Sequence, residues 1–264
     1  ILTRNPINSD QIKRVAVAAA YQGAGVLRER FGQANTVRKK SAVDLVTEAD
    51  TLSEARIIEA IRSRFPDHGV MAEESGTEKG DADYLWIIDP LDGTTNFAHQ
   101  LPLFAVSIAF AEKGDITTGV VLNPMSGELF TATRQEGARL NGHPIRVSRV
   151  AGLNDSLLVT GFPYNVQDIL QPVVDRFAKC LGTAQGIRRL GSAALDLCYV
   201  ACGRFEGFWE ENLKPWDTAA GMLIAEAAGA KVTDFNEQPY RIDGTEIVAT
   251  NGLIHEQLIE LLII

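Results

Sequence analysis

Two aspartates that follow a strongly apolar segment are the residues best suited to chemistry. In the segment WIIDPLDGTTNF at residues 86–97, Asp89 and Asp92 stand three positions apart without a cationic neighbour in sequence. Two carboxylates held together repel each other unless they are protonated or neutralised, and a hard divalent cation is the usual remedy. The backbone N–H groups of residues 93–95 could bind a phosphate as a helix start does. Asp-Pro-x-Asp-Gly is also ordinary turn chemistry, and that alternative stays open at this point.

Two further acidic residues occur where structural elements begin or end. Glu73 follows a short apolar segment, and Asp217 lies near the start of a helix that is rich in small residues. Taken singly, Glu73 is an ordinary loop acid and Asp217 is a first-turn residue that the helix dipole favours. Together with Asp89 and Asp92, they match a more specific pattern.

From about Asp10 to Leu262 the chain resembles the inositol monophosphatase family. Two long motifs in the correct order carry this resemblance, WIIDPLDGTTNFAH at residues 86–99 and WDTAAGMLIAEAAGA at residues 216–230. Shorter family elements are DLVTEAD at residues 44–50, EESG at residues 73–76 and GSAALD at residues 191–196. The resemblance implies an α+β fold, a layered α/β/α/β/α sandwich of the sugar phosphatase type, and commonly a homodimer.

The resemblance also implies two or three magnesium ions per active site. Glu73, Asp89 and the backbone carbonyl of Leu91 would hold one ion. Asp89, Asp92 and Asp217 would hold a second, and a weaker third ion would depend largely on Glu73 and water. Two ions about 4 Å apart activate water, neutralise the phosphoryl oxygens and stabilise the leaving alkoxide, so such a site suits phosphoryl transfer.

Catalysis would involve Thr94, Asp50 and Glu73, according to the same resemblance. Thr94, supported by Asp50, would orient the attacking water. We do not expect Thr94 to be a nucleophile, because the sequence offers no adjacent histidine base. Gly93 and Thr94 would hold the phosphate.

The remaining substrate contacts would come from residues further along the chain. The complete substrate-binding set implied by the resemblance is Asp92, Gly93, Thr94, Ala193 and Glu210. In this set Ala193 and Glu210 would lie beside the polyol hydroxyls, and Glu210 could accept hydrogen bonds from two of them. Arg188 and Arg189 could contact the substrate or a partner subunit, or have only a packing or surface role.

The leading functional hypothesis is magnesium-dependent hydrolysis of myo-inositol 1-phosphate to inositol and phosphate by metal-activated water. Alternative substrates for the same chemistry are fructose 1,6-bisphosphate, histidinol phosphate, adenosine 3′,5′-bisphosphate and NADP. An alternative of another class is a regulatory protein that keeps the fold and acts by binding a partner. Lithium sensitivity is expected of the family, because lithium can replace a magnesium ion.

Hydrophobic periodicity and turn residues predict the secondary structure. The second predicted helix, at residues 49–64, follows a β-like stretch at residues 40–50. Its inward-facing residues are expected to be Leu52, Ala55, Ile58 and Ile61. The strand at residues 84–88 is expected to stop before Pro90, which has no backbone N–H. The other predicted strands are 104–111, 117–122, 129–133 and 138–140, forming an antiparallel meander, and 156–160, 205–209, 231–234 and 246–250. The predicted helices are 10–31, 49–64, 169–181, 192–202, 215–228 and one beginning at residue 254.

The 264 residues and 45% hydrophobic content describe a globular protein with a substantial core. We expect a boundary near Ser148. It separates an N-terminal half, residues 1–148 with most metal ligands, from a C-terminal half, residues 149–264 with Asp217 and the substrate-contacting residues. Because no linker separates them, the two halves should form one integrated phosphatase unit.

Composition also limits the partners. A net charge of −9 argues against a nucleic-acid surface, and the apolar C-terminal segment 258–264 is too short to span a bilayer. The sequence does not begin with a secretory signal, so we expect a cytoplasmic protein. Its expected partners are a small phosphorylated polyol or sugar and a second copy of the chain. Cys198 and Cys202, four positions apart in an apolar helical pattern, should pack in the core. The scattered histidines are expected at the surface.

Overall fold

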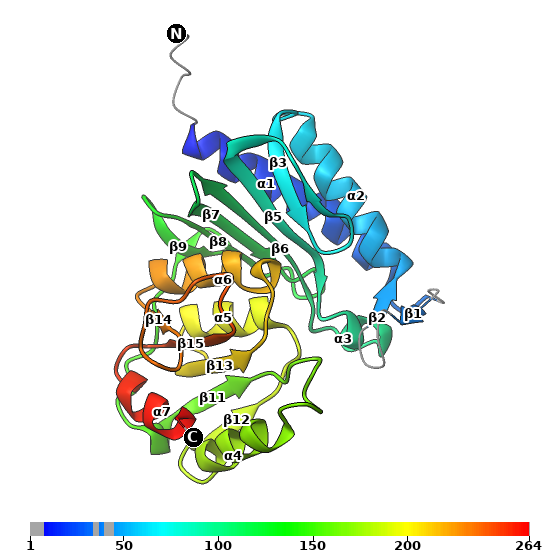
Figure 1. The fold of residues 1–264 in the computed structure, drawn as a ribbon. Coiled ribbons are helices and arrows are strands. Elements are labelled where there is room, and N and C mark those ends of the chain that lie inside the picture. The colour runs from blue at the N-terminus through cyan, green and yellow to red at the C-terminus, as the bar shows by residue number, and fades with distance from the viewer. Residues whose placement is uncertain (1–7, 34–36, 40–44, 264) are drawn as a thin grey trace.

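The computed structural model describes residues 8–33, 37–39 and 45–263, and these form five layers (Figure 1). The outermost layer on one side is the helix pair α1 (Ser9–Arg30) and α2 (Glu48–Arg62), which packs on a large sheet. Helices α5 (Ala193–Ala201) and α6 (Pro215–Ala227) lie between this sheet and a smaller one, and α4 (Leu170–Leu181) and α7 (His255–Leu262) pack near the smaller sheet's other face. The predicted α/β/α/β/α sandwich is confirmed.

The large sheet has eight strands in the order β10-β9-β8-β7-β6-β5-β3-β4. From β5 to β9 each strand is antiparallel to the next, which confirms the predicted meander, whereas β3 is parallel to β5. The strand bounds are β3 (His68–Ala72), β4 (Gly76–Glu78), β5 (Asp81–Asp92), β6 (Ala105–Glu112), β7 (Asp115–Leu122), β8 (Leu129–Thr133), β9 (Gly137–Leu140) and β10 (His143–Pro144).

The smaller sheet has five strands in the order β12-β11-β13-β15-β14. Its strands are β11 (Leu157–Thr160), β12 (Gly186–Arg188), β13 (Gly207–Glu211), β14 (Lys231–Thr233) and β15 (Glu246–Thr250). The remaining elements are the hairpin β1 (Val37–Lys39) and β2 (Leu45–Thr47), the short helix α3 (Thr94–Ala98) and a 3₁₀ turn (Leu153–Asp155). Of the β-like stretch predicted at 40–50, residues 45–47 form β2 and 48–50 begin α2, and residues 40–44 lie outside the described residues.

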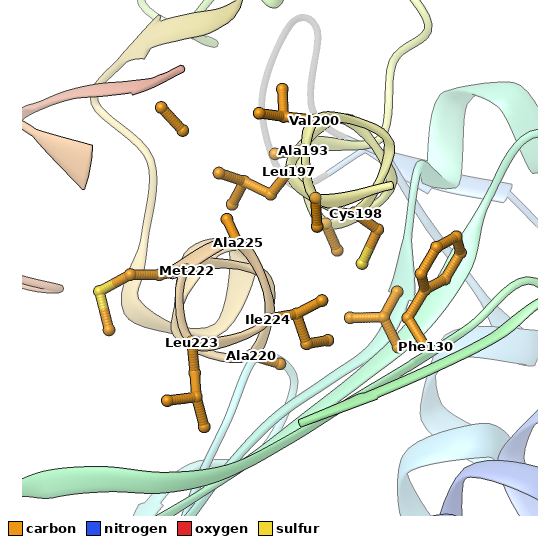
Figure 2. Close-up of a cluster of buried hydrophobic side chains, with 14 of the residues drawn as sticks. Phe130, Ala193, Leu197, Cys198, Val200, Ala220, Met222, Leu223, Ile224 and Ala225 are labelled. Carbon is orange, nitrogen blue, oxygen red and sulfur yellow. The ribbon is translucent and has the colours of Figure 1, made fainter. Parts of the chain in front are cut away.

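The middle helical layer forms the principal core. Every residue of α5 is buried, as are residues 218–225 of α6. Figure 2 shows Cys198 of α5 and Ile224 of α6 in one apolar cluster with Phe130 of β8. A helix that is apolar on all sides requires burial on all sides, and the position between two sheets provides it. The predicted core packing of Cys198 is confirmed, and Cys202 packs against the same cluster, partly buried.

The predicted inward face of α2 is wrong in part. Leu52 is 41% exposed and Ala55 is also exposed, whereas Asp50, Ser53 and Glu54 are buried. Hydrophobic periodicity misjudged this face because its polar side chains point toward polar groups of the molecule. They bond to backbone and side-chain atoms around the carboxyl end of β5, as described below.

The predicted end of the central strand is also wrong. Strand β5 continues through Pro90 to Asp92, and its register with β6 shifts between Asp89 and Asp92. A proline is tolerated at such an irregularity because no ladder hydrogen bond is required from its nitrogen. The shift lets both aspartates stand at the same end of the strand.

The surface prediction for the histidines fails at His255, which is 1% exposed. Its Nε2 lies 3.0 Å from Thr233 Oγ1 and its Nδ1 lies 3.0 Å from Thr250 Oγ1.

None of the described helices combines the length and apolarity needed to cross a membrane. The division near Ser148 stays a prediction, and one core cluster contains residues from both sheets.

Candidate active site

A pocket of about 260 Å³ lies where β5 and β13 end and where α5 and α6 begin. It brings together nearly all of the residues singled out in the sequence, namely Glu73, Asp89, Leu91, Asp92, Gly93, Thr94, Ala193, Glu210 and Asp217. Asp50 does not line the pocket, and lies behind Thr94 with no exposed surface. The fold therefore gathers at one place residues that are up to 144 positions apart in sequence (217 − 73).

The two aspartates of β5 are fixed by different donors. One Asp89 oxygen, Oδ1, accepts a hydrogen bond from the Leu91 backbone N–H at 2.9 Å. Oδ2 of Asp92 accepts from the Ser192 hydroxyl at 2.6 Å and from the Ala194 backbone N–H at 2.8 Å. Asp92 thus joins the large sheet to the first turn of α5, and its orientation depends on both layers.

Glu73 follows β3 directly, and its backbone N–H bonds to the Ile88 carbonyl at 3.2 Å. The next two residues are held from α2, because the Glu54 carboxylate accepts from the backbone N–H groups of Glu74 at 2.8 Å and Ser75 at 2.9 Å. This partly buried contact ties the loop that carries Glu73 to the helix layer. It was not anticipated from the sequence.

Thr94 is held against α2 and β5. Its hydroxyl lies 3.0 Å from Asp50 Oδ1 and 3.1 Å from the Leu91 carbonyl oxygen. Ser53 donates a hydrogen bond of 2.9 Å to the Pro90 carbonyl, which fixes the same part of the strand. The preceding Gly93 has a φ of 99°, a left-handed conformation that glycine adopts without strain. This conformation turns the chain from β5 into α3 at the pocket.

Asp217 enters the pocket from the first turn of α6. Its Oδ2 accepts from the Lys214 backbone N–H at 2.7 Å, and Pro215 occupies the first helical position. Proline is suited to this position because the first N–H groups of a helix have no partner within it. The helix start therefore determines where the Asp217 carboxylate lies.

The pocket strongly disfavours the accumulation of negative charge. Burial, followed by repulsion from Glu73, Asp92 and Asp217, raises the pKa of Asp89 well above its usual value. Burial and repulsion from Asp92 likewise raise the pKa of Asp217 well above its usual value. Burial raises the pKa of Asp92 to about 6, against the opposing effect of the Ser192 hydrogen bond. A cation in the pocket would relieve this repulsion.

The donor set fits a hard divalent cation in its chemistry. Glu73, Asp89, Asp92 and Asp217 offer carboxylate oxygens, and Leu91 of the same pocket offers a backbone carbonyl. Within the described ranges, no three acidic, histidine or cysteine residues form a ready-made metal-binding cluster. The pocket thus supplies the ligand types and the uncompensated charge, while each aspartate is bonded to a local backbone or side-chain donor.

The pocket is also lined by Glu210 of β13 and by the segment after β11. Glu210 is 7% exposed, and its carboxylate occupies the space where Gly161 has no side chain. Burial raises the pKa of Glu210 to about 8, with Arg189 lowering it and Asp92 raising it. Arg189 lines the pocket although it is solvent-exposed, whereas Arg188 donates to the Ile187 carbonyl and is not among the lining residues.

Several polar residues at the site were not assigned a role from the sequence. Ser53 and Glu54 gave no signal, because their partners are backbone atoms distant in sequence. Ser192 forms the N-cap of α5 and Asp196 lies one turn later, buried at the pocket wall. Asp196 could have been noticed, because it is the one acid in an otherwise apolar helical segment.

Comparison with known proteins gives consistent results along most of the chain. Residues 8–263 match the model of the inositol monophosphatase family. Inositol-1-monophosphatase of Synechocystis sp. is 45% identical over 247 residues, which cover 92% of this chain and 86% of the relative. Nus factor SuhB of Pseudomonas aeruginosa is 48% identical over 221 residues, 82% of each chain. The crystal structure of extragenic suppressor protein suhB from Bartonella henselae superposes with a TM-score of 0.92 at 39% identity, covering 96% of this chain and 98% of the other.

The five-layer fold, its acidic pocket and these relatives define a phosphatase that hydrolyses phosphate monoesters. Such enzymes are generally metal-dependent, and a phosphorylated substrate fits the family. The chain belongs to the inositol monophosphatase family. The resemblance noted in the sequence motifs is thereby confirmed.

Proposed function

We propose that this protein hydrolyses the phosphate monoester of a small polyol, with myo-inositol 1-phosphate as the leading substrate and magnesium as the metal. One observation carries the proposal, which is that acidic metal-ligand types and Glu210 line a single pocket. The first group suits a phosphate and its cations, and the second suits hydroxyl groups. The name of the Synechocystis relative, inositol-1-monophosphatase, supports the same substrate.

In the proposed site, Glu73, Asp89, Asp92, Asp217 and the Leu91 carbonyl hold two or three magnesium ions. When bound, these ions would neutralise the phosphoryl charge, activate the attacking water and stabilise the leaving alkoxide. The chain's own contribution is to place these ligands and the phosphate. The shared attachment of Asp92 to Ser192 and Ala194 keeps the two halves of the site in register.

Thr94 is the proposed orienting group for the attacking water. Its single hydroxyl proton is directed toward Asp50 Oδ1 or the Leu91 carbonyl, which leaves an oxygen lone pair free to accept a hydrogen bond from water in the pocket. Asp50 has no exposed surface, and an ionised carboxylate only accepts hydrogen bonds. Asp50 therefore keeps the Thr94 hydroxyl in the role of donor on this side. Glu73, at the same pocket, is the proposed second group acting on water.

Phosphate and polyol are assigned to neighbouring parts of the pocket. Gly93 and Thr94 provide backbone at the start of α3, and a Cβ on Gly93 would crowd the Gly191 and Leu103 carbonyl oxygens, each 3.1 Å away, so glycine is what allows the turn at this point of the pocket. Asp92 and Ala193 line the region between phosphate and polyol, and Glu210 accepts hydrogen bonds from the polyol hydroxyls. Efficient transfer then depends on positioning and charge neutralisation.

A substrate panel tests this assignment. Phosphate release is measured with inositol 1-phosphate, fructose 1,6-bisphosphate, histidinol phosphate, adenosine 3′,5′-bisphosphate and NADP, each with magnesium and with a chelator. We expect magnesium-dependent release with inositol 1-phosphate ranked first. A different leading compound would retain the chemistry and replace the substrate, whereas chelator-insensitive release would contradict the metal assignment.

The proposal extends to properties that the family resemblance implies. We expect a cytoplasmic homodimer. Sedimentation should then give a molecular mass about twice the 28.7 kDa of one chain. We also expect lithium to inhibit phosphate release, since lithium can replace a magnesium ion. A monomeric, lithium-insensitive phosphatase would remove both expectations without affecting the pocket assignment.

A second candidate function is regulatory binding to another protein. It is favoured by one finding, the name Nus factor SuhB of the Pseudomonas aeruginosa relative, which is 48% identical. An Asp92→Asn chain, which should not turn over substrate, is the appropriate bait for a pull-down. Recovery of one stoichiometric partner whose binding survives this substitution would support a role separate from catalysis, and recovery of none would leave the enzyme alone.

A further inference from the structure

Asp196 presents a buried carboxyl oxygen that lacks a hydrogen-bond partner. The residue is 1% exposed, and among the described residues its Oδ1 is the buried side-chain polar atom left without a partner. The same residue lines the pocket, close enough to Glu210 and Asp92 to be repelled by both and to Arg189 to be attracted. An unpartnered acceptor at a pocket wall indicates a ligand donor.

Stability alone does not explain an acid at this position. The helix segment Ala193–Ala201 has apolar residues at its other eight positions, and all nine positions are buried. Burial of a carboxyl oxygen without a hydrogen-bond partner is destabilising, so an apolar residue here would stabilise the free protein. The cost is offset if the carboxyl group acquires its partner from a bound substrate.

We infer that Asp196 is a specificity-determining residue that accepts a hydrogen bond from a hydroxyl group of the substrate's alcohol part. This inference rests on the proposed polyol phosphatase function and adds Asp196 to Glu210 as a second acceptor at the pocket's hydroxyl-binding end. The two carboxyl groups come from different elements, α5 and β13, so they can contact different hydroxyls of one ring.

A hydroxyl group is a suitable donor for this acceptor. It is neutral, and it can donate one hydrogen bond to the free oxygen of Asp196. Several hydroxyl groups on one ligand could donate to both Asp196 and Glu210. The preferred ligand is therefore a polyhydroxylated alcohol.

Kinetics of Asp196→Ala with matched substrates test the inference. The substrates are inositol 1-phosphate, its single-deoxy analogues and 4-nitrophenyl phosphate, which has no hydroxyl in its leaving group outside the ester. We expect KM for inositol 1-phosphate to rise about tenfold, the value of one hydrogen bond of about 1.4 kcal/mol, with 4-nitrophenyl phosphate unaffected. One deoxy analogue should show the same KM increase with the unmodified enzyme and no further increase with the variant.

Two more variants separate substrate recognition from folding. Asp196→Val, which has a similar volume and no oxygen, should reproduce the selective KM increase, and Asp196→Asn, which keeps one acceptor oxygen, should restore most of the affinity. Glu206→Gln is the control for loss of a buried carboxylate, because Glu206 bonds the Leu157 backbone N–H and does not line the pocket. The thermal midpoint of Asp196→Val should equal or exceed that of the unmodified enzyme.

The possible outcomes are distinct. Equal effects on inositol 1-phosphate and 4-nitrophenyl phosphate, or no effect on either, would overturn the role of Asp196 while leaving the phosphatase intact. A lower midpoint without a selective KM change would assign Asp196 a structural role and also overturn the inference. If the unmodified enzyme releases phosphate from 4-nitrophenyl phosphate but not from inositol 1-phosphate, the proposed substrate itself fails, and the inference fails with it.

Discussion

Replacement of Glu54 by alanine should weaken both the fold and the metal site, although Glu54 does not line the pocket. Its carboxylate, 4% exposed, accepts from the backbone N–H groups of Glu74 and Ser75 at 2.8 and 2.9 Å. A hydrogen bond to a charged group contributes about 1.5–3 kcal/mol. Because the two amides are only partly buried and water can replace part of the loss, we expect the free energy of unfolding to fall by about 3 kcal/mol.

The functional consequence should appear in the magnesium dependence. Glu73 immediately precedes the two amides, so its carboxylate loses a fixed position when Glu54 is removed. We expect a higher magnesium concentration at half-maximal phosphate release, and recovery of most of the maximal rate at saturating magnesium. Glu54→Gln, which keeps one acceptor oxygen, should have an intermediate effect.

Urea unfolding measures the change in the free energy of unfolding. A separate magnesium titration of phosphate release by the folded variant measures the change in magnesium dependence. The matched control is Glu59→Ala on the same helix, where the side chain is 70% exposed and pairs with Arg56 at the surface. Such a surface pair contributes less than about 1 kcal/mol. If Glu54→Ala proves as stable as Glu59→Ala and has an unchanged magnesium dependence, the reasoning that α2 positions Glu73 is refuted.

Three other predictions concern charge, pH and packing. Asp92→Asn should reduce phosphate release to below about one hundredth, because a charged ligand is lost while the shape is kept; circular dichroism checks the fold, and near-normal turnover would contradict the ligand assignment. Burial, then Lys231, lowers the pKa of His255 from 6.5 to about 4, so the unfolded chain binds this proton more readily. Stability should therefore fall as pH decreases from about 6.5 toward 4, by up to about 3 kcal/mol, and His255→Gln should flatten this slope in urea unfolding. Gly161→Ala should raise KM for a polyol phosphate more than for 4-nitrophenyl phosphate, because the added methyl group would overlap the Glu210 carboxylate; equal KM changes would contradict the placement of Glu210.

Much of the fold could be predicted because apolar patterning reports burial directly. The meander at β6 to β9 and the apolar helices α5 and α6 follow from strand-length apolar runs, glycine turns and uniformly small or apolar residues. The rule that proline stops a strand failed at Pro90, because a register shift removes the need for its N–H. The helical face of α2 failed because Ser53 and Glu54 are buried against polar backbone.

At the candidate site, too, the sequence identifies some residues and does not reveal those whose partners are backbone atoms. Asp89, Asp92 and Asp217 could be identified because they lie in the two long motifs that resemble the inositol monophosphatase family, and the structure brings them together in one pocket. The supporting contacts of Glu54 could not be found, because its partners are main-chain N–H groups that any residue type would provide. Asp196 belongs to the GSAALD motif, and only the structure shows that its carboxyl group is buried at the pocket wall with one oxygen lacking a partner.

Phosphate release from inositol 1-phosphate as a function of magnesium concentration tests the central claim most directly. The claim is that the acidic pocket formed by Glu73, Asp89, Asp92 and Asp217 acts through bound magnesium. We predict no release in the presence of a chelator, saturable release as magnesium is restored, and loss of that response in Asp89→Asn. Undiminished release in the chelator, or an unchanged magnesium response in Asp89→Asn, would contradict the claim.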